Sequence, residues 1–288
     1  MKIRIFKKVA INSFAVGNQF GSPIGIALCI KLSVANHSCK PVARVVFRNR
    51  AALLVPTDQR KMPTLLENAC HSYIDELQPI ALRRKLLRMK YKFECECEGC
   101  CDDDRNSRME AWNCGICVDG WMKNEEGSHC ELCGWEMTRD HFETCRLAEE
   151  ATKNARITLQ RDDLSLQVRV DLSEKLTNLM ADTLHKFNVL RLPVLRILYG
   201  SALFQKDLEN STRYGIELLD IQKQYQSAND VAILYHKYGL AQVMIALEAW
   251  ESAQELLDEL KPAFTEIYGA DAQVVHNIMS MLEQSHRA

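Results

Sequence analysis

Three cysteines lie close together in the pattern Cys95-x-Cys97-x2-Cys100, and Cys101 follows directly. Thiolates at this spacing bind zinc, but a closed structural site takes four ligands, so three cannot complete its tetrahedral shell. The fourth ligand must come from elsewhere in the chain or from the neighbouring cysteine. Cys39 is a distant candidate and Cys101 a local one, and the spacing alone leaves both open.

A second group of cysteines follows the pattern Cys114-x2-Cys117-x12-Cys130-x2-Cys133. Two CxxC pairs separated by a short loop are typical of a zinc ribbon. Four thiolates leave no open coordination position, so we expect a structural metal rather than a catalytic one. His129 precedes the third cysteine, and we interpret it as a surface histidine rather than a ligand.

The composition indicates a globular chain that does not span a membrane. The 288 residues are 47% hydrophobic and 26% charged, with 12 cysteines. This length suggests about two domains. No apolar run reaches about 18 residues, and the first residues lack the pattern of a signal peptide. We therefore expect a reducing compartment, where cysteines serve as metal ligands more readily than in disulfides.

The charge is unevenly distributed. Residues 1–101 hold 17 Lys and Arg against 7 Asp and Glu, whereas residues 102–288 hold 19 against 31. A basic front region suits an acidic partner or an anionic cofactor, but two oppositely charged regions of one chain also attract each other. Both interpretations stay open, and we expect an acidic-on-basic contact between the front region and the helical tail.

The elements that position these residues differ along the chain. Short apolar runs at 24–30, 42–47 and 51–55 predict strands, and residues 79–91 predict a helix. The acidic stretch 101–108 is interpreted as a polar linker. From about 139 to 287 apolar residues recur at helical spacing, with Asn229 or Asp230 suited to cap one helix. Residues 234–262 loosely fit a tetratricopeptide-like helix pair.

Further motifs make the pattern specific: Asn-His-Ser-Cys at 36–39, Ser-Tyr-Ile-Asp at 72–75, and the CxCxxC group at 95–100. Together with INSF at 11–14 and the run 24–41, they occur in the order found in the SET/MYND protein-lysine methyltransferases. The chain resembles that family from the middle of its SET domain to its helical tail.

The resemblance implies an α+β fold with a partial β-rich SET core, a post-SET zinc site, a small zinc-ribbon insertion and an all-α tetratricopeptide-like region. The expected domains are the SET and post-SET part at 1–101, the linker and ribbon at 102–138, and the helical domain at 139–288.

The family's site residues map onto this chain by motif. Asn36 and His37 match the Asn-His pair that contacts S-adenosylmethionine, Phe93 matches the aromatic residue at its adenine, and Asn12 lies beside the cofactor. Tyr73 matches the tyrosine near the transferred methyl group and is the expected catalytic residue.

Two further groups of residues follow from the same match. Ser13 and Phe14 are expected to line the lysine channel. The resemblance implies post-SET zinc ligands at Cys39, Cys95, Cys97 and Cys100, in addition to the ribbon's own four cysteines.

The expected function is S-adenosylmethionine-dependent methylation of a lysine in a histone or another protein, in the nucleus and cytoplasm. A glycine-rich cofactor loop and a MYND finger are not found in these residues, so we expect an N-terminally shortened product with weak activity. The alternative is an inactive zinc-bearing scaffold for protein interactions. We expect two zinc ions, a possible protein partner on the helical region, and neither membrane nor direct nucleic-acid binding.

Overall fold

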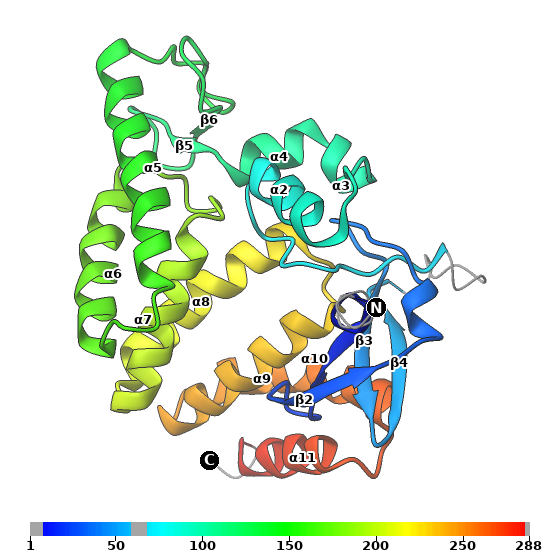
Figure 1. Cartoon of the computed structure of the whole chain (residues 1–288). Coiled ribbons are helices and arrows are strands. Elements are labelled where there is room, and N and C mark those ends of the chain that lie inside the picture. Colours follow the sequence, from blue (N-terminus) through cyan, green and yellow to red (C-terminus); the bar gives the residue numbers. More distant parts are fainter. Residues whose placement is uncertain (1–7, 59–67, 286–288) are drawn as a thin grey trace. The chain divides into compact units, whose positions relative to one another are not determined.

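The computed structural model describes residues 8–58 and 68–285 of the chain. It is a mixed, helix-rich fold with few and short strands (Figure 1). By their internal contacts, the residues form two compact units. Of the described residues, unit 1 comprises 8–58, 68–76, 81–101 and 226–285, and unit 2 comprises 77–80 and 102–225. The expected helical domain at 139–288 instead places residues 226–288 together with the other helices of the tail. The three expected domains stay a prediction.

The front of unit 1 is built from two β-hairpins and short helices. Its elements are β1 (Ser13–Gly17), β2 (Pro23–Leu28), η1 (Leu32–Val34), β3 (Ala43–Arg48), β4 (Ala51–Pro56), α2 (Ile80–Tyr91, which begins in unit 2) and α3 (Glu98–Cys101). β1 pairs with β2 and β3 with β4, both antiparallel. In the second hairpin Arg48 faces Ala51, and Asn49 adopts a left-handed φ of 57°. Asparagine tolerates this conformation, which a two-residue hairpin turn requires.

Three helices complete unit 1: α9 (Val231–Ala246), α10 (Trp250–Tyr268) and α11 (Gln273–Ser285). The Asp230 side chain caps α9 by accepting a hydrogen bond from the backbone N–H of Ala232 at 3.0 Å. Of the two residues expected as this cap, Asn229 and Asp230, the structure selects Asp230. The helices share a core with the strands, in which Val46, Phe20 and Leu53 pack against helix residues such as Phe264. The expected contact between the front and these helices is therefore present, but it is largely apolar.

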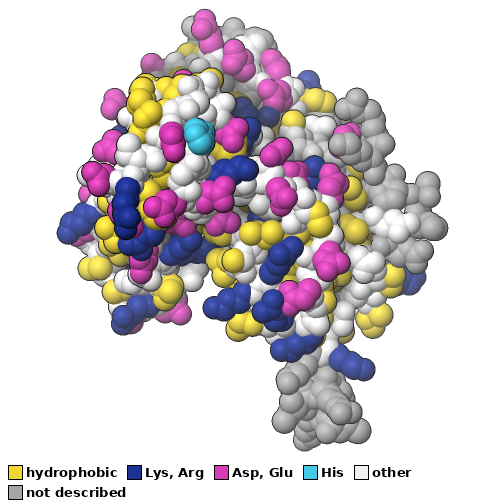
Figure 2. Space-filling model, turned by 90° about the horizontal axis from the view of Figure 1, so that it is seen from above, with side chains coloured by type: hydrophobic (Ala, Val, Ile, Leu, Met, Phe, Trp, Pro, Cys, Tyr) yellow, Lys and Arg dark blue, Asp and Glu magenta, His cyan; other side chains and the backbone are white. Residues whose placement is uncertain are grey.

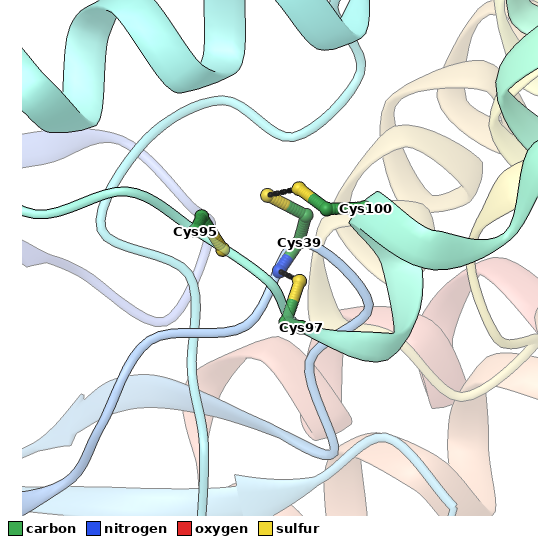
Figure 3. Close-up of side chains that lie close together, drawn as sticks. All are labelled: Cys39, Cys95, Cys97 and Cys100. Carbon is green, nitrogen blue, oxygen red and sulfur yellow. Dashed lines mark hydrogen bonds between the residues drawn. The ribbon is translucent and has the colours of Figure 1, made fainter.

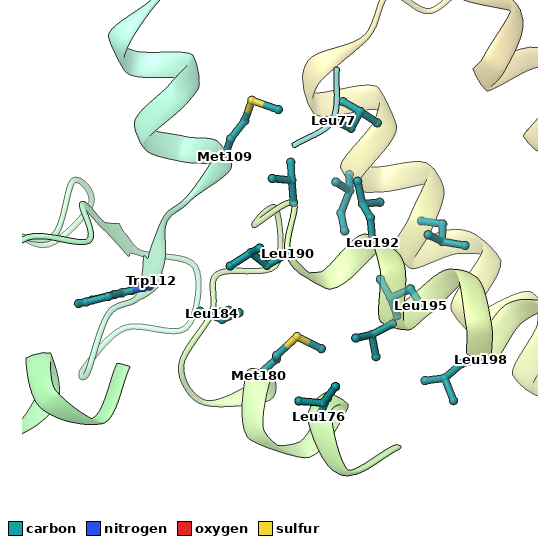
Figure 4. Packing of buried hydrophobic residues seen from close by; sticks show 14 of the residues in the cluster. Leu77, Met109, Trp112, Leu176, Met180, Leu184, Leu190, Leu192, Leu195 and Leu198 are labelled. Atoms are coloured by element: carbon teal, nitrogen blue, oxygen red, sulfur yellow. The ribbon is translucent and has the colours of Figure 1, made fainter. Parts of the chain in front are cut away.

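Unit 2 consists of a short hairpin and five helices: α4 (Asp103–Met109), β5 (Trp112–Asn113), β6 (Trp121–Met122), α5 (Arg139–Leu159), α6 (Leu166–Ala181), α7 (Arg191–Gln205) and α8 (Leu208–Tyr225). Its core joins leucines from α6 and α7 with Met109, Met180 and Trp112 in one cluster, part of which Figure 4 shows. Ser165 and Thr138 cap α6 and α5. None of the helices in the described ranges is long and apolar enough for a membrane span.

The polar-linker prediction for 101–108 is wrong, because residues 103–109 form α4. The Asp102 carboxylate accepts the backbone N–H of Arg105 at 3.0 Å and caps the helix. Asp103 and Asp104 lie in the first turn, where negative charge favours the helix dipole. Met109 at the end is fully buried. The acidic residues that suggested a solvated linker are thus a helix-start signal.

Candidate active site and zinc centres

The first cysteine group forms a compact cluster in unit 1. Cys39 comes from the loop after η1, and the other three thiols come from the segment that enters α3. The four Sγ atoms all lie within 4.8 Å of one another and converge on a common centre (Figure 3). The Cys39 and Cys100 sulfurs are 3.6 Å apart. Tetrahedral zinc with Zn–S bonds of about 2.3 Å requires sulfurs about 3.8 Å apart, so the cluster fits zinc.

The alternative ligand Cys101 lies outside this cluster. It is exposed, and its Sγ donates to the Glu96 carbonyl at 3.5 Å. The loop that carries Cys39 instead packs directly against the backbone of α3, since a Cβ on Gly99 would lie 3.0 Å from the Lys40 nitrogen. Hydrogen bonds from the Cys100 and Cys39 thiols also hold the pKa of Cys97 below its ordinary range. The geometry therefore selects Cys39 as the fourth member.

The second group of four forms a ribbon centre in unit 2. Its Sγ atoms also lie within 4.8 Å of one another, with Cys114 and Cys133 3.7 Å apart and Cys117 and Cys130 3.6 Å apart. The backbone N–H groups of Cys117 and Cys133 each donate to the first sulfur of their own pair at 3.5 Å. These bonds favour thiolates. The ribbon therefore also fits zinc, and both centres are closed.

Cys130 and its neighbour His129 differ in whether they belong to the metal centre of the ribbon. The backbone N–H groups of Leu132 and Cys133 outweigh burial and lower the pKa of Cys130 to about 7. His129 is exposed and lies outside the four-sulfur group, as expected of a surface histidine. The ribbon thus completes its shell with sulfur alone.

Tyr73, also in unit 1, is fixed by hydrogen bonds at its side-chain hydroxyl and at its backbone N–H. Its hydroxyl donates to the Ala35 carbonyl at 2.6 Å, and its backbone N–H donates to Nδ1 of His37 at 3.1 Å. The segments around His37 and His71 run side by side, and the His71 N–H donates to the Asn36 carbonyl at 3.0 Å. Burial raises the pKa of the Tyr73 hydroxyl, which therefore stays protonated at neutral pH.

His37 joins Tyr73 to the first zinc centre. Its Nε2 lies 3.2 Å from the Cys39 sulfur, while its Nδ1 accepts the amide of Tyr73. Since Nδ1 is an acceptor, the ring proton lies on Nε2, which donates to the sulfur. Burial lowers the pKa of His37 to about 4, so the neutral ring with this tautomer is the form present at pH 7. One imidazole thus couples the backbone at Tyr73 to a metal ligand.

Aromatic rings surround Tyr73. The centroids of Tyr91, His71 and His37 lie 4.9, 5.0 and 5.2 Å from that of Tyr73. The cluster extends to Phe14, which is 5.7 Å from His71, and to Phe93, which is 6.0 Å from His37. Such rings present negative faces that attract ammonium or sulfonium groups.

A cavity of about 500 Å³ opens at this cluster. Its walls include four of the predicted site residues, namely Asn12, Ser13, Phe14 and Tyr73. Asn36, His37 and Phe93 are not among its lining residues. His37 and Phe93 reach Tyr73 through ring contacts, and the exposed Asn36 precedes His37. Asn12, Ser13 and Phe14 therefore line the cavity together with Tyr73, whereas His37 and Phe93 belong to the ring cluster next to it.

Two cavity residues, His71 and Arg44, were not anticipated from the sequence. His71 is 6% exposed, its Nδ1 bonds to the Ser72 carbonyl, and its buried Nε2 has no hydrogen-bond partner in the described ranges. Burial lowers its pKa, so it is neutral and Nε2 offers a lone pair. Its position two residues before Tyr73 was the available signal, since side chains alternate in extended chain.

The Arg44 guanidinium binds two buried carboxylates. Its Nε and Nη2 contact Asp230 at 2.8 and 2.7 Å, and it also bonds to Glu76, which follows the Tyr73 segment. Burial opposes the charge of Glu76, but Arg44 outweighs it and lowers the pKa of that carboxyl. Arg44 therefore fixes the Tyr73 segment to the start of α9, and no local sequence pattern reveals it.

Comparison with known proteins finds SET-domain proteins and lysine methyltransferases among the relatives of this chain. The chain is 53% identical over 278 residues to "SET domain-containing protein 14" of Caenorhabditis elegans, an alignment that covers 96% of this chain and 65% of the relative. It is 22% identical over 279 residues to human "N-lysine methyltransferase SMYD2", covering 97% of this chain and 59% of the relative.

A shorter stretch of 104 residues is 35% identical to human "Histone-lysine N-methyltransferase SMYD3", covering 36% of this chain and 24% of that protein. No protein-family profile matches the sequence. The chain thus spans about two thirds or less of the length of these relatives, and its similarity to the SET/SMYD group extends over nearly all of its own residues.

Proposed function

Because the chain belongs to the SET/SMYD family of protein-lysine methyltransferases, we propose that it transfers a methyl group from S-adenosylmethionine to a lysine side chain of a protein. The observation that carries the proposal is the arrangement at Tyr73. A tyrosine fixed at its hydroxyl and at its amide lies among aromatic rings, at a cavity large enough for a lysine side chain.

The aromatic walls supply the environment for a cationic substrate. Phe14, Tyr73 and Tyr91 line the cavity, and their ring faces stabilise a lysine ammonium or a sulfonium centre as it approaches. Partial burial of the amine in the cavity then opposes the attraction of the rings and favours the neutral amine over the ammonium. A neutral amine is the nucleophile that methyl transfer needs.

The Tyr73 hydroxyl has a defined orientation. Its proton is donated to the Ala35 carbonyl, so the lone pairs of its oxygen remain as acceptors for an N–H of the target amine. S-adenosylmethionine, when bound, supplies an activated methyl group on sulfur. The protein's contribution is mainly positioning, which in oriented systems accounts for several kcal/mol of the barrier.

The cofactor would be held next to this tyrosine. We assign Asn36, His37, Phe93 and Asn12 to its binding and Ser13 and Phe14 to the lysine channel. What supports the assignment is that these residues lie on the segments around Tyr73, with the rings of His37 and Phe93 6.0 Å apart. The buried, unpartnered Nε2 of His71 offers an additional polar group at the cavity.

The finer features are proposals of the same kind. They comprise a histone or other protein substrate, weak activity of these residues by themselves, a tetratricopeptide-like helical region that holds a protein partner, the three domains expected from the sequence, and action in the nucleus and cytoplasm.

Transfer of a labelled methyl group from S-adenosylmethionine to mixed histones and other lysine-rich proteins tests the proposal. We expect slow labelling of lysine by the zinc-loaded chain and at least about a hundredfold less by Tyr73→Phe. Tyr199→Phe, in α7 of unit 2, is the control and should label like the original chain. Absence of labelling by a folded, zinc-loaded protein that also fails to bind S-adenosylmethionine would favour the scaffold alternative.

A further inference from the structure

The tips of the zinc ribbon carry large apolar side chains that face solvent. Ile116 and Leu132 occupy the same position in the two CxxC pairs and are 69% and 65% exposed, and Val118 beside the first pair is 94% exposed. The four sulfurs of the ribbon lie within 4.8 Å of one another, so the two CxxC loops that carry Ile116 and Leu132 come together at the zinc centre. We call these three exposed side chains the ribbon tip.

The fold of the ribbon does not need these three side chains. Its interior is filled by other residues, since Met122 and Met137 are buried and a Cβ on Gly115 would lie 2.6 Å from the Trp135 ring. Gly120 is packed equally closely against the sulfurs of Cys117 and Cys130. The ribbon tip is therefore surplus to the packing, and clustered exposed apolar groups mark interaction sites.

The surroundings of the ribbon tip are acidic. Residues 111–138 contain five acidic residues and a single lysine. Asp119 pairs with Lys186 at 2.7 Å, whereas the other four are exposed and form no ion pair with any residue of the described ranges: Glu125, Glu126, Glu131 and Glu136. Figure 2 shows one face of the molecule, on which apolar, acidic and basic side chains all lie exposed. An apolar surface with this rim attracts apolar groups flanked by positive charge.

We propose that the ribbon tip is a docking surface for a basic peptide segment of another protein that carries one or two large apolar side chains. The apolar side chains of the segment cover Ile116, Val118 and Leu132, and its lysines or arginines face the glutamates. The proposal rests on the ribbon alone and holds whether or not the chain transfers methyl groups.

Binding to arrays of synthetic twelve-residue peptides tests it with the zinc-loaded, full chain. The first array varies the positions of Leu, Ile, Val and Phe among lysines and arginines. A second array replaces the apolar residues by serine, and a third replaces the basic residues by glutamate. We expect binding on the first array only, weakening as salt is added, because screening weakens attraction between exposed charges.

Variants locate the surface. The triple change Ile116→Ser, Val118→Ser, Leu132→Ser should reduce affinity for the retained peptides about tenfold or more, since central apolar contacts carry most binding energy. The pair Glu131→Gln, Glu136→Gln should weaken binding less and flatten its salt dependence. Phe204→Ser, at an exposed apolar position of α7, should change nothing. Zinc content checks that each ribbon stays folded.

Four results would overturn the proposal. They are the absence of binding on the first array, equal binding on all three arrays, unchanged binding by the triple serine variant, and equal loss of binding with Phe204→Ser. Sedimentation provides a fifth, because self-association that the triple variant abolishes would assign the ribbon tip to a second copy of the chain.

Discussion

Replacing Arg44 by methionine should destabilise unit 1 strongly. The Arg44 side chain is only 15% exposed, and its partners Glu76 and Asp230 are 4% and 2% exposed. Methionine keeps the volume but removes the charge, which leaves two buried carboxylates without a counter-ion. Removing one partner of a buried ion pair costs about 3–5 kcal/mol. Arg48→Met, an exposed position on the same strand, should cost within about 0.5 kcal/mol.

Hydrogen exchange followed by mass spectrometry measures this unit separately, which is necessary because two units need not unfold together. The free-energy loss predicts that amides of β3 and α9 exchange roughly a hundred to a few thousand times faster in Arg44→Met. Amides of unit 2 should keep their rates. Exchange in β3 that is as slow as in Arg48→Met would show that Arg44 does not stabilise unit 1 through its two carboxylates.

The stability lost in Arg44→Met should also depend on pH, in a direction set by the pKa of Glu76. The pKa of Glu76 lies below its ordinary value of 4.5 in the folded protein, so this group stabilises the fold above that pH, and its contribution is lost as the pH falls through the folded pKa. Without Arg44 the buried carboxyl instead has a raised pKa. The deficit of Arg44→Met should therefore shrink as the pH falls from 7 toward 4.5, and a deficit that grows would contradict the assignment.

Three further outcomes are expected. Metal analysis of the reduced chain should give two zinc per protein, and Cys97→Ser should keep one, whereas Cys101→Ser should keep both; a loss in Cys101→Ser would contradict the choice of ligands. Gly120→Ala should release the ribbon zinc to a chelator faster, because a Cβ there would lie 2.3 Å from the Cys117 sulfur, while Gly200→Ala, which meets nothing within 4 Å in a helix, should not. His37→Phe should weaken zinc binding at the first centre, since it removes the hydrogen bond to Cys39, and unchanged zinc affinity would argue against the coupling.

The cysteine clusters could be predicted because most of their ligands lie only two or three residues apart in the sequence, at spacings typical of zinc sites. Two CxxC pairs at a short interval admit few structures, and the ribbon centre is the one expected. Cys39 needed more, since it is 56 residues from the nearest other ligand and the spacing left Cys101 as a rival. The Asn-His-Ser-Cys motif of the family resemblance resolved that choice, and the structure selects the same residue.

The remainder depends on contacts that no local pattern contains. Arg44 and Asp230 are 186 residues apart, and a lone arginine on a strand looks like any exposed charge. The acidic residues before α4 have two interpretations, as a solvated linker or as a helix start. The Asp102 cap and the buried Met109 at the end of α4 decide for the helix. The position of His71 two residues before Tyr73 is a weak signal, and the rings that surround His71 in the fold are what place it in the site.

Calorimetric titration of the zinc-loaded chain with S-adenosylmethionine shows whether the segments around Tyr73 bind the cofactor. We expect measurable binding, weaker than low micromolar, that is lost in Asn36→Ala and retained in Asn229→Ala, an exposed asparagine before α9. Absence of binding, or equal binding by both variants, would show that the segments around Tyr73 do not form the cofactor site.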